Sequence, residues 1–282
     1  MVDDVFQLGG VDIVAGGHQH PLDPLAEVNK AILVHTAQVA GVEPDAAVHM
    51  AAEGLDAFRG FCILGVIIVH FIYDLTGLYG ILHWDAPVLF RFIQNWGGVL
   101  FLLLSGVCAT LGSRSVRRGV IVFACGMICT AVTAGMLWLG MAGESIIIRF
   151  GVLHCLGLCM ILWAVFKKLP TWSLAILGAV MVALGFWFQG IRVEATWLFP
   201  LGLTAPGFSS SDYFPLFPHL GFFLLGSVLG RTLYRNKQTL FPKVNTQAPV
   251  LRFLSFCGRQ SLFIYLLHQP VLNLICMLFP LS

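Results

Sequence analysis

Charged residues are scarce in this 282-residue chain. Asp, Glu, Lys and Arg together make up 11% of the sequence, whereas soluble domains carry roughly 25%. Hydrophobic residues account for 58%, and the mean hydropathy is +0.86. This composition excludes an ordinary soluble domain, and we expect no nucleic acid among the partners. The chain is predicted to be an integral membrane protein surrounded by the lipid bilayer.

Several familiar motifs are also absent. Residues 53–282 contain no Walker loop, no dinucleotide fingerprint and no metalloprotease motif. All eight cysteines lie in or at the ends of hydrophobic windows, which argues against a disulfide framework. Cys125/Cys129 and Cys155/Cys159 are spaced to share a helix face, but packing of small polarisable side chains explains them better than a metal does. We therefore expect no metal.

Long hydrophobic windows define the fold class. A membrane-spanning helix needs about 20 apolar residues, and seven such windows can be drawn. They lie at 61–82, 89–111, 119–141, 146–166, 171–190, 214–234 and 259–280. The prediction is an all-α, polytopic bundle of about seven transmembrane helices within a membrane domain at 50–282.

The basic residues predict the orientation, because cytoplasmic loops retain Lys and Arg. If the chain before Phe61 is cytoplasmic, then from residue 50 onward that side receives twelve basic residues and the far side only three. The twelve are Arg59, Arg114, Arg117, Arg118, Lys167, Lys168, Arg231, Arg235, Lys237, Lys243, Arg252 and Arg259, and the three are Arg91, Arg149 and Arg192. We expect a cytoplasmic N-terminus, an extracytoplasmic C-terminus and a bacterial inner membrane.

Residues 1–49 form a separate, non-membrane extension without the layout of a signal peptide. Within it, 9–41 is typical of strand, glycine turn and strand, and its Gly-His-x-His block resembles calcineurin-like metallophosphoesterases and 5′-nucleotidases. That resemblance would place His18 and His20 at a two-metal centre. The family's other ligand blocks are missing, so we assign no activity here. We expect an orphan fragment or an overextended start, with Met50 as the alternative beginning.

Ionisable residues interrupt the first hydrophobic window. Arg59, His70 and Asp74 lie in an otherwise apolar run, and Asp at mid-bilayer costs roughly 2.5–3.5 kcal/mol on insertion scales. His70 and Asp74 are four residues apart and share a helix face, so the carboxylate can orient the imidazole as a general base. The alternative is a polar pair that only joins helices. His83 follows just beyond the outer end of the helix.

Further polar residues gather at the same depth. Arg91, Arg149 and His154 lie in the outer parts of the second and fourth predicted helices, as candidate substrate-binding groups. Three more candidates are Asp212, expected in the first turn of the sixth helix, Tyr213 and His219.

The last predicted helix carries Ser261, Tyr265 and His268 at i, i+4 and i+7, which makes one polar stripe. Arg259 stands at its predicted cytoplasmic mouth, where it can meet a phosphate.

A family resemblance rests on motifs in a fixed order. They are the segment 55–60, the pair His70 and Asp74, and the segments 150–154, 212–218 and 258–268. Together they resemble the bacterial relatives of the heparan-α-glucosaminide N-acetyltransferase catalytic domain, over about residues 53–280. The spacing of Arg59 and His70 and the Ser-Leu-x-x-Tyr-x-x-His run are also similar to the wider class of transmembrane acyltransferases.

The resemblance implies acetyl transfer across the bilayer, from cytoplasmic acetyl-CoA to an amine or hydroxyl of a sugar on the outer side. Arg59 would contact CoA or shape the cytoplasmic mouth, with Arg259 and the 261/265/268 stripe as further donor-side residues. His70 would be the general base or acyl relay. The family's catalytic loop histidine best matches His83, so both histidines stay candidates.

Three alternatives use the same residues. A proton-coupled transporter would use the His and Asp side chains as a relay. A haem protein would use His70, His154, His219 and His268 as axial ligands. A non-catalytic membrane protein would only bind a partner or lipid. The acceptor, small molecule or glycan, and a possible homodimer are left open.

Overall fold

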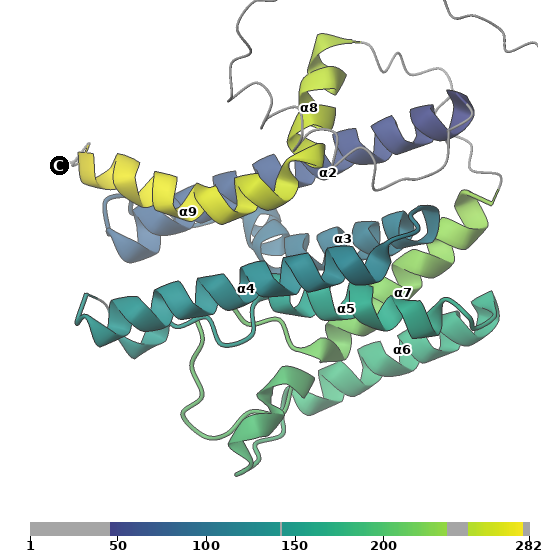
Figure 1. Cartoon of the computed structure of the whole chain (residues 1–282). Coiled ribbons are helices and arrows are strands. Elements are labelled where there is room, and N and C mark those ends of the chain that lie inside the picture. Colours follow the sequence, from purple (N-terminus) through teal and green to yellow (C-terminus); the bar gives the residue numbers. More distant parts are fainter. Residues whose placement is uncertain (1–45, 142, 236–247, 279–282) are drawn as a thin grey trace, which may run out of the picture. The chain divides into compact units, whose positions relative to one another are not determined.

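The computed structural model describes residues 46–141, 143–235 and 248–278. The metallophosphoesterase-like block at 9–41 lies outside them. The helices, in chain order, are α2 (Ala46–Tyr73), the π-helix η1 (Asp74–Leu78), α3 (Val88–Leu111), α4 (Ser115–Trp138), the 3-10 helix η2 (Glu144–Ile146), α5 (Val152–Phe166), α6 (Thr171–Phe188), the 3-10 helix η3 (Thr196–Leu201), α7 (Leu216–Leu233), α8 (Pro249–Arg259) and α9 (Ser261–Leu278) (Figure 1).

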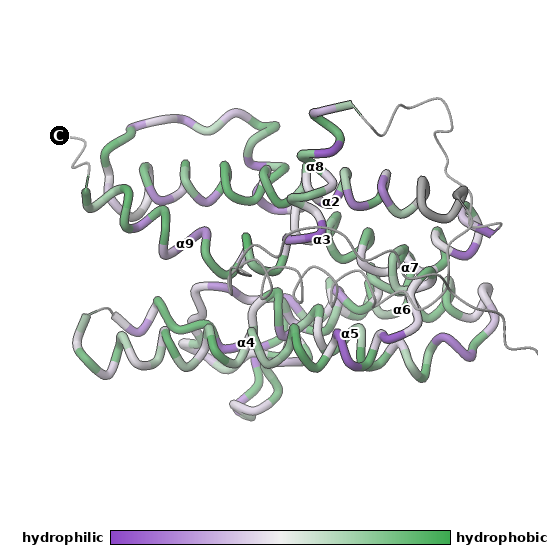
Figure 2. Tube along the Cα trace, turned by 45° about the horizontal axis from the view of Figure 1, so that its top comes forward, coloured by the Kyte–Doolittle hydropathy of each residue, from purple (hydrophilic) through white to green (hydrophobic). Residues whose placement is uncertain are grey.

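The predicted all-α membrane bundle is confirmed. Among the described residues, six helices are long and apolar enough to cross a bilayer. Apolar residues follow the whole length of α4 and α9 in Figure 2, and on α4 Ile128 and Val132 are more than half exposed. Large aliphatic side chains on an outward face suit lipid rather than water.

The seventh predicted window, 146–166, is only partly helical. Its helix, α5, begins at Val152 and has 15 residues, which at 1.5 Å per residue span about 22 Å of a core roughly 30 Å thick. The preceding backbone is extended and pairs with a second loop, through Ser211 N to Ile147 O (3.0 Å) and Phe214 N to Phe150 O (2.9 Å). Non-helical backbone is tolerated at membrane depth where protein satisfies its hydrogen bonds.

α5 lies in the interior of the bundle. Eight of its residues are buried, and its core also takes in buried side chains from α3, α4, α6 and α7. Trp163 fills part of this core, and its indole N–H donates to Ala109 O on α3 (3.0 Å). A helix enclosed by protein does not need the full length of a lipid-facing one, which explains why α5 is short.

The last predicted window, 259–280, corresponds to one helix, α9, and a separate helix, α8, precedes it. α8 ends at Arg259 and α9 begins at Ser261, and α8 runs across the direction of α2 and α9 (Figures 1 and 2). α8 crosses α2 at two glycines, because a side chain at Gly60 would overlap the backbone of Leu254 and one at Gly258 the backbone of Asp56. This crossing brings α9 beside the C-terminal half of α2.

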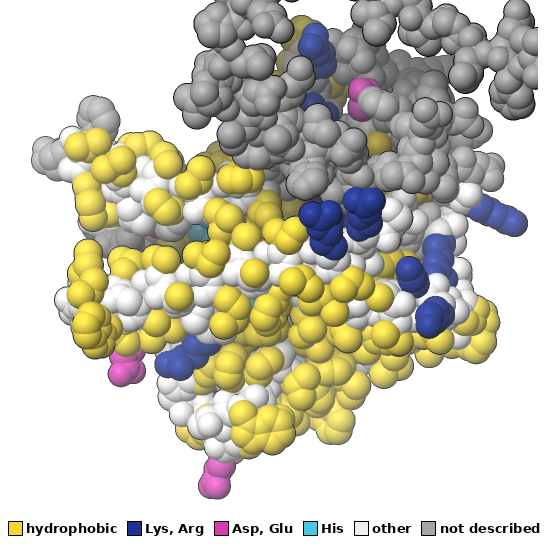
Figure 3. Space-filling model, in the orientation of Figure 1, with side chains coloured by type: hydrophobic (Ala, Val, Ile, Leu, Met, Phe, Trp, Pro, Cys, Tyr) yellow, Lys and Arg dark blue, Asp and Glu magenta, His cyan; other side chains and the backbone are white. Residues whose placement is uncertain are grey.

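The basic residues collect at one end of the packed helices. α5 and α6 meet α7 there, since Arg231 donates to Lys167 O (2.6 Å) and Leu169 O (2.7 Å). In Figure 3 the dark blue side chains lie mainly toward the right-hand ends of the helices. We call this the basic end of the bundle.

The crossing of α3 and α7 supplies a test of the packing. A methyl group on Gly106 would overlap the carbonyl of Phe223, whereas one on Gly97 of the same helix meets no atom within 4 Å. Gly106→Ala should therefore destabilise the fold by about 1–3 kcal/mol through overpacking, and Gly97→Ala should be neutral or slightly stabilising. Thermal unfolding in detergent measures both variants, and equal behaviour would contradict this packing.

Candidate active site

Three polar contacts join α2 and its π-helical extension to α9. The rings of His70 and His268 meet edge to face at 4.8 Å between centroids. Gln269 Nε2 donates to both carboxylate oxygens of Asp74, at 3.0 and 3.1 Å. Tyr79 Oη donates to Asn273 Oδ1 at 3.1 Å. We call these three pairs the polar seam, and it contains two of the predicted site histidines, His70 and His268.

The tautomer of His70 follows from its backbone contact. Nδ1 lies 2.8 Å from Val66 O, one turn back on α2, and a carbonyl only accepts hydrogen bonds. Nδ1 must therefore carry the proton, which leaves Nε2 as an acceptor in the neutral ring. The expectation that Asp74 orients His70 is wrong: Asp74 binds Gln269 instead, because α9 supplies a donor that the sequence of α2 cannot show.

His268 is the buried partner of His70. It is 8% exposed, and its Nδ1 makes a short hydrogen bond with Tyr265 O. That carbonyl again requires the proton on Nδ1. Nε2 of His268 is buried and has no hydrogen-bond partner among the described residues.

Asp212 connects the seam to α5. Its Oδ2 accepts the Val152 N–H at the start of α5 (2.9 Å) and faces Tyr265 Oη at 3.5 Å. The carboxylate thus caps α5, and the expectation that it opens the sixth helix is wrong, because α7 begins only at Leu216. Burial raises the pKa of Asp212, and the Val152 hydrogen bond and the nearby His70 oppose that rise.

His154 is fully engaged within the protein. It is 2% exposed, accepts the Gly151 N–H at Nδ1 (3.2 Å) and lies 3.3 Å from Thr130 Oγ1 at Nε2. Thr130 in turn donates to Ile148 O (2.6 Å). Both ring nitrogens of His154 are used to fix the segment before α5, so neither is left to bind a substrate. His154 instead positions the backbone that Asp212 caps.

The other predicted residues lie outside the seam. His83 and Arg91 are exposed, His83 in the loop before α3 and Arg91 in the first turn of α3. Arg149 is also exposed, and its Nε donates to Ser209 O (3.1 Å), which ties down the loop before Asp212. Arg59 pairs with Asp56 at 3.1 Å, and Ser261 is the first residue of α9.

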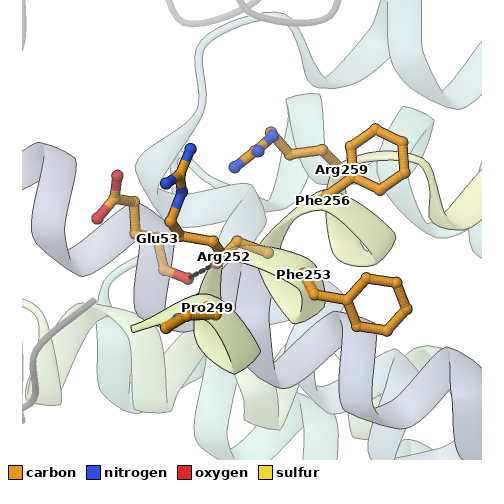
Figure 4. Close-up of a pocket in the computed structure, with 7 residues that line it drawn as sticks. Glu53, Pro249, Arg252, Phe253, Phe256 and Arg259 are labelled. Carbon is orange, nitrogen blue, oxygen red and sulfur yellow. Dashed lines mark hydrogen bonds between the residues drawn. The ribbon is translucent and has the colours of Figure 1, made fainter. Parts of the chain in front are cut away.

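A cavity of about 510 Å³ lies between α2 and α8, with Arg252, Phe253, Phe256 and Arg259 among its lining residues. In Figure 4 the guanidinium groups of the two arginines extend on one side of α8, while the two rings point away from them. Arg59 is not part of this lining. The cavity belongs to the basic end of the bundle. It offers two positive charges to a ligand, and the carboxylate of Glu53 also belongs to its lining.

A second cavity of about 510 Å³ lies at the other end of α6 and α7, where it is lined by Tyr213 and His219 together with Gln189, Arg192 and Ser210. Burial raises the pKa of Tyr213 to about 12, so its phenol stays protonated and donates to Phe199 O (2.6 Å). The neighbouring Asp212 side chain faces the seam instead. Consecutive residues of one loop therefore face the cavity and the seam.

A protein-family model for the heparan-alpha-glucosaminide N-acetyltransferase catalytic domain matches residues 52–270. The chain belongs to this family. The match covers most of the chain and contains every residue of the polar seam except Asn273. Searches of curated proteins and of solved structures find no match.

Membership of the N-acetyltransferase family makes the protein a transmembrane acyltransferase, and transferases of this family use acetyl-CoA. Within the described ranges, no group of three or more His, Cys, Asp or Glu side chains is arranged to hold a metal. Acyl transfer from a thioester needs a base and an oxyanion donor. The ring of His268 lies 4.8 Å from that of His70 and 5.1 Å from that of Tyr265, between centroids, so a base and a donor belong to one cluster.

Gln269 is the residue of this N-acetyltransferase-like site that the sequence pattern missed. It falls beside the 261/265/268 stripe rather than on it, and its partner Asp74 is 195 residues away. A signal was present, because Gln269 and Asn273 are polar residues at i and i+4 in an otherwise apolar helix.

The Asp212 cap can be tested apart from catalysis. Asp212→Ala removes the acceptor of the Val152 N–H and should lower stability by about 1 kcal/mol, which thermal unfolding in detergent detects. Ser211→Ala is the matched control, since its side chain is exposed and its backbone bond to Ile147 O remains. An equal loss in both variants would contradict a capping role.

Proposed function

We propose that the protein moves an acetyl group from acetyl-CoA, bound at the basic end, to an amine or hydroxyl of an amino sugar or other glycan at the opposite end of the bundle. The basic end would face the cytoplasm, in keeping with the retention of Lys and Arg there. Family membership supports the reaction class. The observation that carries the mechanism is the orientation of His70, with Nδ1 tied to Val66 O and Nε2 free to accept a proton.

The transfer requires one bond to form and one to break. The acceptor nitrogen or oxygen attacks the thioester carbonyl carbon, the new C–N or C–O bond forms, and the C–S bond breaks to release CoA. His70 Nε2 takes the proton of the attacking group and returns it to the leaving thiolate. If His70 instead carries the acetyl group as a relay, Nε2 attacks first and the acceptor attacks the acyl-imidazole.

Tyr265 is the best-placed donor for the developing oxyanion. Its hydroxyl lies a long 3.5 Å from Asp212, so it can turn to a stronger acceptor without loss of a good hydrogen bond. His268 cannot donate from Nδ1, because Tyr265 O already takes that proton. Arg149 is exposed and already bonded to Ser209 O, so it supports the loop rather than the oxyanion.

The cavity between α2 and α8 suits the phosphate end of the donor. Guanidinium groups bind phosphate through charge-assisted, often bidentate hydrogen bonds, and Arg252 and Arg259 both line this cavity. From here α9 leads to the seam, since Ser261 and His268 are about 10 Å apart along the helix axis. The Tyr213/His219 cavity at the opposite end would admit the acceptor.

Proton-coupled transport is the second candidate. It is favoured by the continuity of the seam, which carries polar side chains from His70 through Asp74 to Tyr79. It predicts substrate uptake without consumption of acetyl-CoA, so the two functions separate in one assay.

His70 decides the mechanism. In detergent, His70→Ala should lower acceptor-dependent CoA release at least about 100-fold, the usual contribution of a general base. His70→Asn keeps a donor for Val66 O but no base at Nε2, so it should fold and be equally inactive. His83→Ala should retain activity. Activity lost in His83→Ala and kept in His70→Asn would transfer the catalytic role to His83.

The donor cavity makes a separate prediction. Arg252→Gln and Arg259→Gln should each raise the KM for acetyl-CoA about 3- to 10-fold, as expected for a partly solvated charged hydrogen bond, with kcat little changed. Arg235→Gln is the matched control, an exposed arginine at the basic end that does not line the cavity. An unchanged KM in both cavity variants would place the phosphates elsewhere.

A further inference from the structure

Asp74 and Gln269 form the most buried contact of the polar seam. Asp74 is 1% exposed, and it starts the π-helical turn η1, a wide turn that is often found at functional sites. Gln269 Nε2 is within 3.0 and 3.1 Å of the two carboxylate oxygens. One amide nitrogen therefore serves both oxygens of the carboxylate.

This contact fixes the orientation of the Gln269 amide. Both Asp74 oxygens act as acceptors, so the NH₂ group of Gln269 must face them and Oε1 must face away. Oε1 is buried and has no hydrogen-bond partner among the described residues. If the Gln269 amide could rotate freely, it could present either its NH₂ group or Oε1 to a ligand. In the orientation that Asp74 imposes, it presents only the acceptor Oε1.

His268 offers a second acceptor from the adjacent position on α9. Its Nδ1–H is taken by Tyr265 O, and Nε2 is also buried without a partner in the described ranges. A buried acceptor left without a donor costs about 1–3 kcal/mol, so two on consecutive residues beside His70 indicate a ligand with two donors.

We propose that Gln269, oriented by Asp74, is a specificity-determining residue that binds the acyl acceptor together with His268. Gln269 Oε1 and His268 Nε2 accept hydrogen bonds from two neighbouring N–H or O–H groups of that acceptor. The acceptor class is therefore a sugar with its reacting amine or hydroxyl next to another hydroxyl, rather than an isolated amine. This assignment rests on the proposed acyl transfer.

The principal test is steady-state CoA release by the full chain with methyl glucosaminide as acceptor. Gln269→Met keeps the length of the side chain but removes the acceptor, and should raise the KM for methyl glucosaminide about 3- to 10-fold, with the KM for acetyl-CoA unchanged. Gln94→Met is the matched control, because it makes the same change at an exposed glutamine of α3 that lines neither cavity, and it should leave both KM values unchanged.

The role of Asp74 is tested by Asp74→Asn. An Asn side chain can donate to Gln269 Oε1, which allows the amide to turn and present NH₂ to the ligand. This variant should reproduce the raised acceptor KM of Gln269→Met, and the effects of the two changes together should be less than additive. Additive effects of the two changes on the acceptor KM would contradict the role of Asp74 in orienting Gln269.

The 3-deoxy analogue of methyl glucosaminide tests the ligand side. Wild-type kcat/KM should fall about 3- to 10-fold without the 3-hydroxyl, and this preference should shrink in Gln269→Met or in His268→Asn, which keeps a donor for Tyr265 O but has no acceptor at the Nε2 position. An active wild type whose acceptor KM is unaffected by Gln269→Met, or equally affected by Gln94→Met, overturns the assignment alone. A wild type that releases no CoA with any sugar overturns the proposed function, and the assignment with it.

Discussion

Hydrocarbon offers no hydrogen bonds, and this constraint shapes the whole protein. Each backbone N–H and C=O group at membrane depth must find a partner within the protein. The Asp212 carboxylate meets this need at the point where the interior helix α5 begins, by accepting the Val152 N–H. The same carboxylate faces Tyr265 on α9, so the interior of the bundle and the polar seam share one anchor. Without that cap, a buried helix start would leave its amide groups unpaired.

The arrangement of α2, α8 and α9 follows from close packing of backbones. Gly60 and Gly258 allow α8 to cross α2 at a distance that any larger side chain would forbid, and small residues serve this purpose in membrane helices generally. The crossing turns the chain so that α9 runs beside α2, and His70 then meets His268. The polar seam thus depends on two residues that have no side chain at all.

Much of the fold could be predicted from the sequence, because hydrophobic windows record the thickness of the bilayer. The segments 89–111 and 171–190 became α3 and α6 almost unchanged. The window at 146–166 was partly wrong, since protein rather than lipid surrounds α5 and the extended segment before it. Within the site, spacing on one helix identified His70, Tyr265 and His268, but it assigned the wrong partner to Asp74 and the wrong helix to Asp212. Both errors concern contacts between segments far apart in the chain.

The sequence by itself determined that the protein is a helical membrane bundle, that its basic residues gather at one end, and which family it belongs to. Those properties depend on composition, periodicity and motif order, all of which are local. How the polar atoms pair depends on the tertiary structure. Val66 O fixes the tautomer of His70, and Asp74 fixes the orientation of the Gln269 amide. His154 is engaged in contacts that fix the backbone before α5. Hydrogen bonds depend on distances of a few tenths of an ångström between elements, and no local pattern specifies such distances.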